Sequence, residues 1–303
     1  MKYSYDLKKV ENKVILITGG TSGIGFEAVK ALANNKANIL LAARNETKAN
    51  NCIAQIKTEF PEAKITFIKL DISSKKSIYE FYESFKLLNI NIDSLILNAG
   101  VFNIPTHEIT EDGFEFQLAT NYLGHFLLTK LLYKHINEYG RIIQLSSLSH
   151  TWHDIQLDNI NLIDEYTPIK AYAQSKLANL IFGLELARRL SNVNSTIKSI
   201  PVHPGVSNTG LTRSGDRTNK LSQKLYKLGF MIGGQSAKAG ALPILFAVTS
   251  DVAENGVYYG PSHLMESRGK PKPAKIGKLA KSEEKARALW ALTEELLDVK
   301  FEV

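Results

Sequence analysis

Two side chains that together can transfer a proton, Tyr172 and Lys176, stand four residues apart in a stretch with helical spacing of apolar residues. Residues at this separation share one face of a helix. A phenol with an ordinary pKa near 10 is a poor acid or base at neutral pH unless a nearby cation stabilises its phenolate. Lys176 supplies that cation, and the hydroxyl of Ser147, upstream at the end of an apolar run, suits hydrogen bonding to a substrate oxygen. These residue types predict proton exchange with a carbonyl or an alcohol.

A glycine-rich turn directly follows the first apolar run, with its glycines spaced G-x3-G-x-G. At a strand-to-helix turn, missing side chains let the backbone approach a pyrophosphate at the helix N-terminus. A purely structural turn is the alternative, but the position within a strand–helix–strand unit favours dinucleotide binding. The predicted cofactor contacts at this turn are Gly19, Thr21, Ser22, Gly23, Ile24 and Gly25.

The end of the second apolar run bears on which nicotinamide cofactor fits. An NAD-specific site carries an acidic residue there, about 20 residues after the glycines, to bond the ribose 2′-OH. This chain has Arg44 and Asn45 at that place and no carboxylate until Glu46. A guanidinium neutralises and hydrogen-bonds a 2′-phosphate. The sequence therefore favours NADP(H) over NAD(H), with an ordinary surface arginine as the alternative.

Apolar runs alternate with amphipathic stretches, as in strand–helix–strand units whose parallel sheet is buried on both faces. Seven strands are predicted, at residues 14–17, 38–42, 65–70, 94–97, 141–145, 196–202 and 256–259. Helices are predicted from the glycine turn to about 34, then to about 59, from 75, and at 114–136, 171–190, 236–248 and 282–298. The fold class is therefore α/β, with residues 1–303 forming one single-domain Rossmann fold whose doubly wound parallel sheet has helices on both faces.

Two segments depart from this alternation. Residues 205–234 are polar and rich in glycine, and we expect them to form a substrate loop beside the strand ends. Tyr226, Phe230 and Met231 in this loop either line an apolar substrate pocket or pack in the core. Residues 262–303 form a basic C-terminal extension whose central part is expected to be a solvated loop.

Composition limits the other classes of protein. The net charge of +7 comes largely from the C-terminal run, which contains prolines and no interleaved aromatic residues. That pattern favours a solvated basic segment over a nucleic-acid or anionic-membrane surface. Cys52 is the only cysteine, which excludes an intramolecular disulfide and fits a reducing compartment. The sequence shows no secretory signal and no apolar run of the roughly 18 residues that a membrane span needs, so we expect a cytoplasmic protein.

A series of motifs in chain order resembles the compact, single-domain branch of the short-chain dehydrogenase/reductase family. The motifs are the glycine turn, Asp71-Ile72, Asn98-Ala99-Gly100, Asn121, Ser146-Ser147, Tyr172 with Lys176, and Pro204-Gly205. The resemblance implies a catalytic set of Asn121, Ser147, Tyr172 and Lys176, with Ser146 packed in the strand end and Asn121 supporting a water-linked proton path. It adds cofactor contacts from Asp71 and Ile72 (adenine), Asn98, Ala99 and Gly100 (ribose), Tyr172 and Lys176, and Pro204, Gly205, Val206 and Thr209 (nicotinamide side).

Within the family, residues 121–129, 146–150 and 175–179 resemble the retinol dehydrogenase and WW-domain oxidoreductase-like group. This implies hydride transfer between the nicotinamide and a carbonyl or alcohol group of an apolar small molecule, such as a retinal-like compound, an aldehyde or a ketone. A catalytically idle NADP(H) sensor or scaffold on the same fold is the alternative, although the full catalytic set is present. A nucleic-acid binder has only the net charge in its favour. Such enzymes commonly pair through the helices at 114–136 and 171–190, which leaves a homodimer and a homotetramer open.

Several histidines could be mistaken for metal ligands. None has the required spacing to acidic or cysteine partners, and hydride transfer needs no metal. We expect core or supporting positions for His125, His150, His153 and His203.

Overall fold

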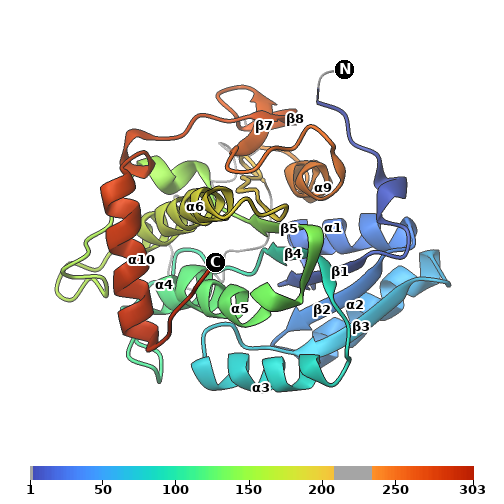
Figure 1. The fold of residues 1–303 in the computed structure, drawn as a ribbon, viewed down its shortest axis with the longest axis horizontal. Coiled ribbons are helices and arrows are strands. Elements are labelled where there is room, and N and C mark those ends of the chain that lie inside the picture. Colours follow the sequence, from blue (N-terminus) through green and yellow to red (C-terminus); the bar gives the residue numbers. More distant parts are fainter. Residues whose placement is uncertain (1–2, 208–233) are drawn as a thin grey trace, which may run out of the picture.

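The computed structural model of the chain describes residues 3–207 and 234–303. Its centre is a parallel sheet with the strand order β3-β2-β1-β4-β5-β6 (Figure 1). These strands are β1 (Val14–Thr18), β2 (Asn38–Ala43), β3 (Lys64–Lys69), β4 (Ile92–Leu97), β5 (Ile136–Gln144) and β6 (Lys198–Ser199). The winding reverses between β1 and β4, and ligands of doubly wound sheets bind beside the carboxyl ends of the strands at such a reversal.

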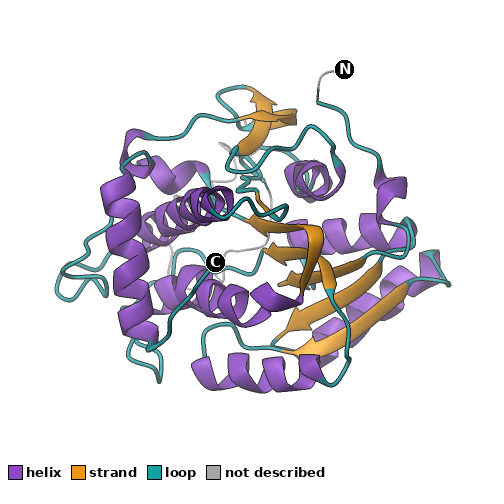
Figure 2. Ribbon diagram, viewed as in Figure 1, coloured by secondary structure: helices purple, strands orange, loops and turns teal. Residues whose placement is uncertain are grey.

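Helices cover both faces of the sheet (Figure 2). Strand β1 shows the cause, because Ile15 and Ile17 join one buried apolar cluster while Leu16 joins the other. The first cluster is completed by α1 (Gly23–Asn34), α2 (Glu46–Glu59) and α9 (Leu242–Thr249). The second is completed by α3 (Lys75–Lys86), α5 (Gly124–Leu132), α6 (Pro168–Asn192) and α10 (Glu283–Leu297). The α/β class and the doubly wound sheet predicted from the sequence are confirmed.

The predicted helix at residues 114–136 is interrupted where the site is built. Helix α4 (Phe116–Leu118) passes into a π-helical turn, Ala119–Leu123, before α5 begins at Gly124. A Cβ on Gly124 would lie 1.9 Å from the carbonyl oxygen of Ile72, so this close contact with the segment after β3 requires glycine. The widened turn places Asn121 at its centre.

The boundary between that helical stretch and β5 was predicted wrongly. Ile136 already belongs to β5 and pairs with Ile92 of β4, whereas regular pairing resumes only at Arg141 with Ser94. The residues between form an irregularity in which Tyr139 has a φ of +62°. A bulge of this kind conceals a strand from a simple alternation pattern.

The predicted seventh strand, at residues 256–259, is also a correction. Tyr259 makes only an isolated parallel bridge to Val202 at the edge of the sheet. Pro201 and Pro204 flank this edge and have no N–H to extend a ladder. The described part of the parallel sheet therefore has six strands.

The basic segment expected to be a loop contains a strand instead. After Tyr259 the chain forms an antiparallel hairpin of β7 (Tyr259–His263) and β8 (Arg268–Pro273). The Ala274 N–H donates to the Tyr258 carbonyl at 2.8 Å, so these two residues form a hydrogen-bonded pair. In an antiparallel ladder hydrogen-bonded and non-hydrogen-bonded pairs alternate, and the hairpin's prolines therefore occupy pairs without cross-strand hydrogen bonds. These prolines are Pro261, Pro271 and Pro273.

Other boundaries differ from the predicted ones by a few residues, and the predicted helix at 236–248 is divided at Ala241 into α8 (Ala237–Gly240) and α9.

Helix α10 lies beside α6 and α5 at the outside of the molecule (Figure 1). Its Trp290 ring contacts Phe126 and Phe301, with centroids 4.9 and 5.1 Å apart. The Arg189 guanidinium lies over the same ring at 4.0 Å.

Replacing Trp290 with alanine should lower the free energy of unfolding by about 3–5 kcal/mol, the range for losing a large buried aromatic side chain. Trp290 is 2% exposed, whereas Trp152, the other tryptophan, is 53% exposed. Urea unfolding followed by circular dichroism tests the difference, with Trp152→Ala as the matched control. Equal costs for both variants would contradict the packing of α10 described above.

Candidate active site

Close backbone contacts determine the glycine turn between β1 and α1. Gly19 has a φ of +68°, and a Cβ there would lie 2.7 Å from the Cα of Ala99. A Cβ on Gly25 would lie 2.4 Å from the Gly19 carbonyl oxygen. Ser22 is the N-cap residue of α1, but its side chain accepts no hydrogen bond from the N–H groups of the first turn. Such a turn fits a pyrophosphate.

The other predicted contacts at this turn differ in exposure. Thr21 and Gly23 are half-buried and Ser22 is exposed. Ile24 is buried in the apolar cluster of α1, so only its backbone can face a ligand.

Asn98 connects the end of β4 to the glycine turn. Its side-chain amide donates to the carbonyls of Thr18 at 2.9 Å and Gly19 at 3.0 Å. Both protons of the amide nitrogen are therefore used to hold the turn. Its Oδ1, the carbonyls of Asn98 and Ala99, and the backbone of Gly100 are the groups left for a cofactor, because the N–H groups of Asn98 and Ala99 donate to Thr18.

The hydroxyl of Thr18 joins three parts of the site. Its oxygen accepts the N–H groups of Asn98 at 3.0 Å and Ala99 at 2.9 Å. Its single proton is then donated to His125 Nε2 at 2.9 Å, so the histidine carries its own proton on Nδ1. That Nδ1–H donates to the Asn121 carbonyl at 2.9 Å. Burial lowers the pKa of His125 to about 4, which keeps the ring neutral in this role.

The side chain of Asn121 connects the segment after β4 with α6. Its Oδ1 accepts the Val101 N–H at 2.8 Å, and its Nδ2 donates to the Val101 carbonyl at 3.1 Å and to the Ser175 hydroxyl at 2.8 Å. A backbone N–H can only donate, so Val101 determines which end of the amide is oxygen. Gly100 lies against this amide, since a Cβ there would be 3.1 Å from Asn121 Oδ1 and 3.4 Å from Lys176 Nζ.

Lys176 is a buried amine on α6. Its Nζ donates to the Leu145 carbonyl at 3.0 Å and lies 5.8 Å from the centroid of the Tyr172 ring. Burial lowers the pKa of Lys176 to about 8. The ammonium form still predominates at pH 7, so a positive charge stands beside Tyr172. Tyr172 itself is half-buried, and Phe102 packs edge-on against its ring at 4.6 Å between centroids.

Ser146 and Ser147 have different environments. Ser146 is buried, and its hydroxyl donates to the Lys176 carbonyl at 2.7 Å. Ser147 is half-buried and begins the 3₁₀ turn Leu148–Thr151, which packs against α6. Its Oγ accepts the Ser149 N–H at 3.2 Å, which occupies a lone pair and leaves the hydroxyl proton for another acceptor.

The cation expected at the end of β2 is paired at the surface. Arg44 is exposed, and its Nη1 lies 3.5 Å from Asp71 Oδ2 at the end of β3. Asn45 caps α2, with its Oδ1 accepting the Lys48 N–H at 2.8 Å, so its side chain serves the helix. Ile72 is buried in the cluster of α3 and α5.

The segment after β6 is held by the hairpin. Gly205 has a φ of +67°, and a Cβ there would lie 2.3 Å from the Ser267 carbonyl oxygen, to which the Val206 N–H donates at 2.9 Å. The Pro204 carbonyl accepts the side-chain amide of Gln235 at 2.7 Å. Most of the predicted substrate loop lies outside the described residues, including Thr209, Tyr226, Phe230 and Met231.

The histidines divide into two groups. His125, His150 and His203 are buried as expected, whereas His153 is exposed and its predicted core position is wrong. In residues 3–207 and 234–303, no three histidine, cysteine, aspartate or glutamate side chains are grouped to hold a metal ion. The same ranges contain no helix with the length and apolar character needed to span a bilayer.

Sequence analysis missed several residues of the site. Ser175 and Phe102 contact Asn121 and Tyr172 directly. Thr18 was also missed, and it connects the glycine turn with Asn121 through His125, which has the kind of supporting position expected for it. The available signals were positional: Thr18 immediately precedes the glycines, and His125 follows Asn121 by one helical turn.

Comparisons with known proteins show what the chain is similar to. Residues 13–220 match the family model described as short chain dehydrogenase. The chain is 35% identical to human retinol dehydrogenase 13, over 96% of this chain and 86% of that protein. It is 35% identical to human polyprenol dehydrogenase, over 82% of this chain and 76% of that protein.

Other relatives match over different shares of their length. Short-chain dehydrogenase TIC 32 B, chloroplastic, of Brassica napus is 45% identical, over 65% of this chain and 65% of that protein, just under two thirds. A solved structure of an uncharacterised protein from Mycobacterium paratuberculosis superposes with a TM-score of 0.80 at 30% identity, covering 99% of this chain and 100% of that one.

The buried amine predicts a dependence of stability on pH. The pKa of Lys176 is lower in the folded chain than in the unfolded chain, so the unfolded state binds more protons between these values. Stability contributed by this residue therefore rises with pH above about 8. Between pH 7 and 9.5, wild type should gain about 2 kcal/mol in free energy of unfolding relative to Lys176→Met. Urea unfolding of both proteins across this range measures the difference, and parallel curves would contradict the lowered pKa.

Proposed function

Because the chain belongs to the short-chain dehydrogenase/reductase family, in the group of retinol dehydrogenases, polyprenol dehydrogenase and WW domain-containing oxidoreductase, we propose that it is an NADP(H)-dependent oxidoreductase. Its substrate is the carbonyl or alcohol group of an apolar small molecule. The observation that carries this proposal is the buried ammonium of Lys176 beside the Tyr172 ring at the carboxyl end of the sheet.

Tyr172 is the proton donor in reduction and the proton acceptor in oxidation. The Lys176 charge favours the phenolate and so lowers the pKa of the phenol toward neutral pH. Asn121 keeps α6 in register with the segment after β4 through Ser175 and Val101. In this assignment its place in the π-helical turn supports a water-linked path from Lys176.

Ser147 orients the substrate. Its hydroxyl proton is directed to the substrate oxygen, where negative charge develops during reduction. Phe102 against Tyr172 gives the site an apolar surface. The printed names of two relatives, a retinol dehydrogenase and a polyprenol dehydrogenase, favour an apolar substrate of the retinal-like, aldehyde or ketone type.

The glycine turn fits a dinucleotide because its glycines allow a tight turn into α1, and Ser22 provides no side-chain cap for the N–H groups that would meet a pyrophosphate. When bound, the nicotinamide cofactor supplies or accepts the hydride. The proposed contacts to it are Gly19, Thr21, Ser22, Gly23, Ile24, Gly25, Arg44, Asn45, Asp71, Ile72, Asn98, Ala99, Gly100, Tyr172, Lys176, Pro204, Gly205, Val206 and Thr209.

NADP(H) is favoured over NAD(H) by charge at the end of β2. Arg44 is a half-exposed guanidinium whose ion pair with Asp71 is long, at 3.5 Å, and open to solvent. Such a pair stabilises the fold little, so the guanidinium is free to turn toward a 2′-phosphate at small cost.

Three further proposals concern the whole protein. Its single cysteine suits a reducing compartment, so we propose that the protein is cytoplasmic. We also propose that residues 1–303 act as one catalytic unit and that the protein assembles as a homodimer or a homotetramer.

Replacing Tyr172 with phenylalanine should reduce turnover by at least about 100-fold while leaving NADPH affinity largely unchanged, because only the hydroxyl that carries the exchangeable proton is lost. NADPH consumption over aldehydes, ketones, quinones and retinoids, together with NADPH titration by fluorescence, measures both quantities. Tyr79→Phe on α3, 40% exposed, is the matched control and should keep full activity. If Tyr172→Phe turns over substrate near the wild-type rate, the proposed role of Tyr172 is refuted. If the wild-type protein binds NADPH but turns over none of these substrates, the idle sensor is favoured.

Replacing Arg44 with aspartate should shift preference from NADPH toward NADH by about 10-fold or more, since it exchanges a phosphate-binding cation for a carboxylate that suits the 2′-OH. The ratio of kcat/KM for the two cofactors measures the shift. Arg287→Asp on α10 makes the same charge change at another exposed position and should leave the ratio unaltered. An unchanged ratio in Arg44→Asp would mean that Arg44 is an ordinary surface residue.

A further inference from the structure

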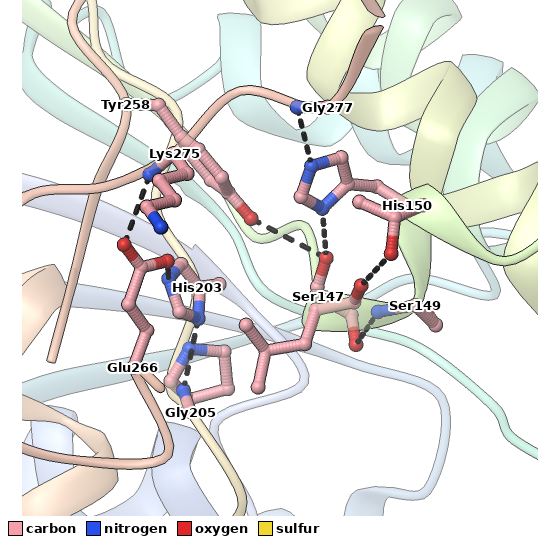
Figure 3. Close-up of polar contacts among 12 residues, drawn as sticks. Ser147, Ser149, His150, His203, Gly205, Tyr258, Glu266, Lys275 and Gly277 are labelled. Atoms are coloured by element: carbon pink, nitrogen blue, oxygen red, sulfur yellow. Dashed lines mark hydrogen bonds and ion pairs between the residues drawn. The ribbon is translucent and has the colours of Figure 1, made fainter. Parts of the chain in front are cut away.

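The backbone carbonyl of Ser147 is approached by three hydrogen-bond donors. The ring Nδ1 of His150 donates to it at 2.7 Å, and the backbone N–H of the same residue lies at 3.2 Å. The Tyr258 hydroxyl approaches it at 3.4 Å (Figure 3). The backbone of this serine is therefore fixed from its carbonyl side.

The proton position on His150 follows from its second contact. The N–H of Gly277 donates to His150 Nε2 at 3.1 Å. Because a backbone N–H only donates, Nε2 carries the lone pair and Nδ1 carries the proton. Burial lowers the pKa of His150, which is consistent with a neutral ring. Gly277 thus selects the tautomer that donates to Ser147.

Gly277 belongs to the C-terminal extension and is far from Ser147 in sequence. Its backbone lies close to the 3₁₀ turn Leu148–Thr151, which begins after Ser147 and is called the serine turn below. A Cβ on Gly277 would lie 3.1 Å from His150 Nε2 and 2.8 Å from Thr151 Cγ2. A residue with a side chain would push the two segments apart. The absence of a side chain therefore allows the hydrogen bond to form.

Tyr258 reaches the same carbonyl from the strand edge before β7. It is 1% exposed, and its ring lies 5.5 Å from that of His150 and 5.1 Å from that of His203. Packing on both sides fixes the phenol, so its hydroxyl approaches Ser147 from one direction. At 3.4 Å it is the weaker donor of the two side chains.

We propose that His150 is a positioning residue for Ser147, and that the C-terminal extension acts on the reaction through the chain Gly277–His150–Ser147. This inference rests on the proposed function, in which the Ser147 hydroxyl orients the substrate oxygen. Among residues 3–207 and 234–303, the hydrogen bond given to the serine Oγ is a long one, 3.2 Å from the Ser149 N–H. Its direction is therefore governed by the backbone, and the backbone is held by His150. His150 touches neither substrate nor cofactor in this assignment.

Two substitutions separate the donor from the acceptor of His150. In asparagine the side-chain amide nitrogen occupies the place of Nδ1, so His150→Asn keeps a donor for Ser147 and loses the acceptor for Gly277. In glutamine the side-chain oxygen reaches the place of Nε2, so His150→Gln keeps the acceptor and loses the donor. Each variant loses one of the two hydrogen bonds of the ring, and both should lower the melting temperature to a similar degree.

Their kinetics should differ. We expect His150→Gln to lower kcat by about 10–100-fold, because displacement of an orienting group by a fraction of an ångström has effects of this size. His150→Asn should retain kcat within about threefold of wild type. The KM for NADPH and the pH profile set by Tyr172 should be unchanged in both. His153→Gln, at the exposed histidine three residues later, is the control and should behave as wild type.

Tyr258→Phe provides a second measurement that keeps the packed ring and removes the hydroxyl, which is the weaker donor to Ser147 and also contacts the Ser146 side chain. It should lower kcat by a few-fold and leave the melting temperature within a few degrees of wild type. Nitrogen-15 NMR of the imidazoles adds a readout independent of turnover, in which His150 should show the neutral Nδ1–H form at pH 7.

The inference is overturned if wild type turns over substrate and the Asn and Gln variants lose kcat equally. It is also overturned if the loss falls on the KM for NADPH, or if NMR shows the Nε2–H form. If wild type turns over no substrate, the proposed function itself fails, and the inference fails with it. The two failures are distinguished by wild-type activity alone.

Discussion

The buried hydroxyl of Thr18 is the contact on which the rest of the site depends. It has two lone pairs and one proton, and all three are used: by the N–H groups that follow β4 and by His125. Through these bonds the glycine turn, the end of β4 and the π-helical turn of Asn121 are held at fixed distances. A valine at this position would leave two backbone N–H groups and a histidine nitrogen without partners, which costs more than losing one ordinary hydrogen bond.

Lys176 is the second constraint, and it opposes folding. Burial of its amine disfavours the charged form, yet the proposed chemistry needs that charge beside Tyr172. The Leu145 carbonyl, 3.0 Å from Nζ, offsets part of the cost. Gly100 allows the amine and the Asn121 amide to lie close together, because a side chain there would fill the space between them. The site therefore combines one unfavourable burial with several well-satisfied polar groups around it.

The sequence was sufficient to predict the sheet and helices whose apolar periodicity is strong, such as β1, β2 and α6. Its short motifs also named Tyr172 and Lys176, which the structure brings together on α6. It was insufficient where long-range contacts decide. The bulge of β5 at Tyr139 and the hairpin that accommodates three prolines depend on pairing partners that no local pattern reveals. The tautomers of His125 and His150 depend likewise on a threonine and a glycine distant in the chain.

The anchoring of the serine turn by the C-terminal extension has a consequence for synthesis. A chain leaves the ribosome with its N-terminus first, at roughly 5–20 residues per second. The residues of the glycine turn, Tyr172 and Lys176 are synthesised before Tyr258 and Gly277. During that interval the nascent chain contains the residues of the glycine turn but lacks the contacts that Tyr258 makes with Ser147 and Gly277 makes with His150. The order of translation therefore places the synthesis of the glycine turn well before that of the segments that contact His150 and the Ser147 carbonyl.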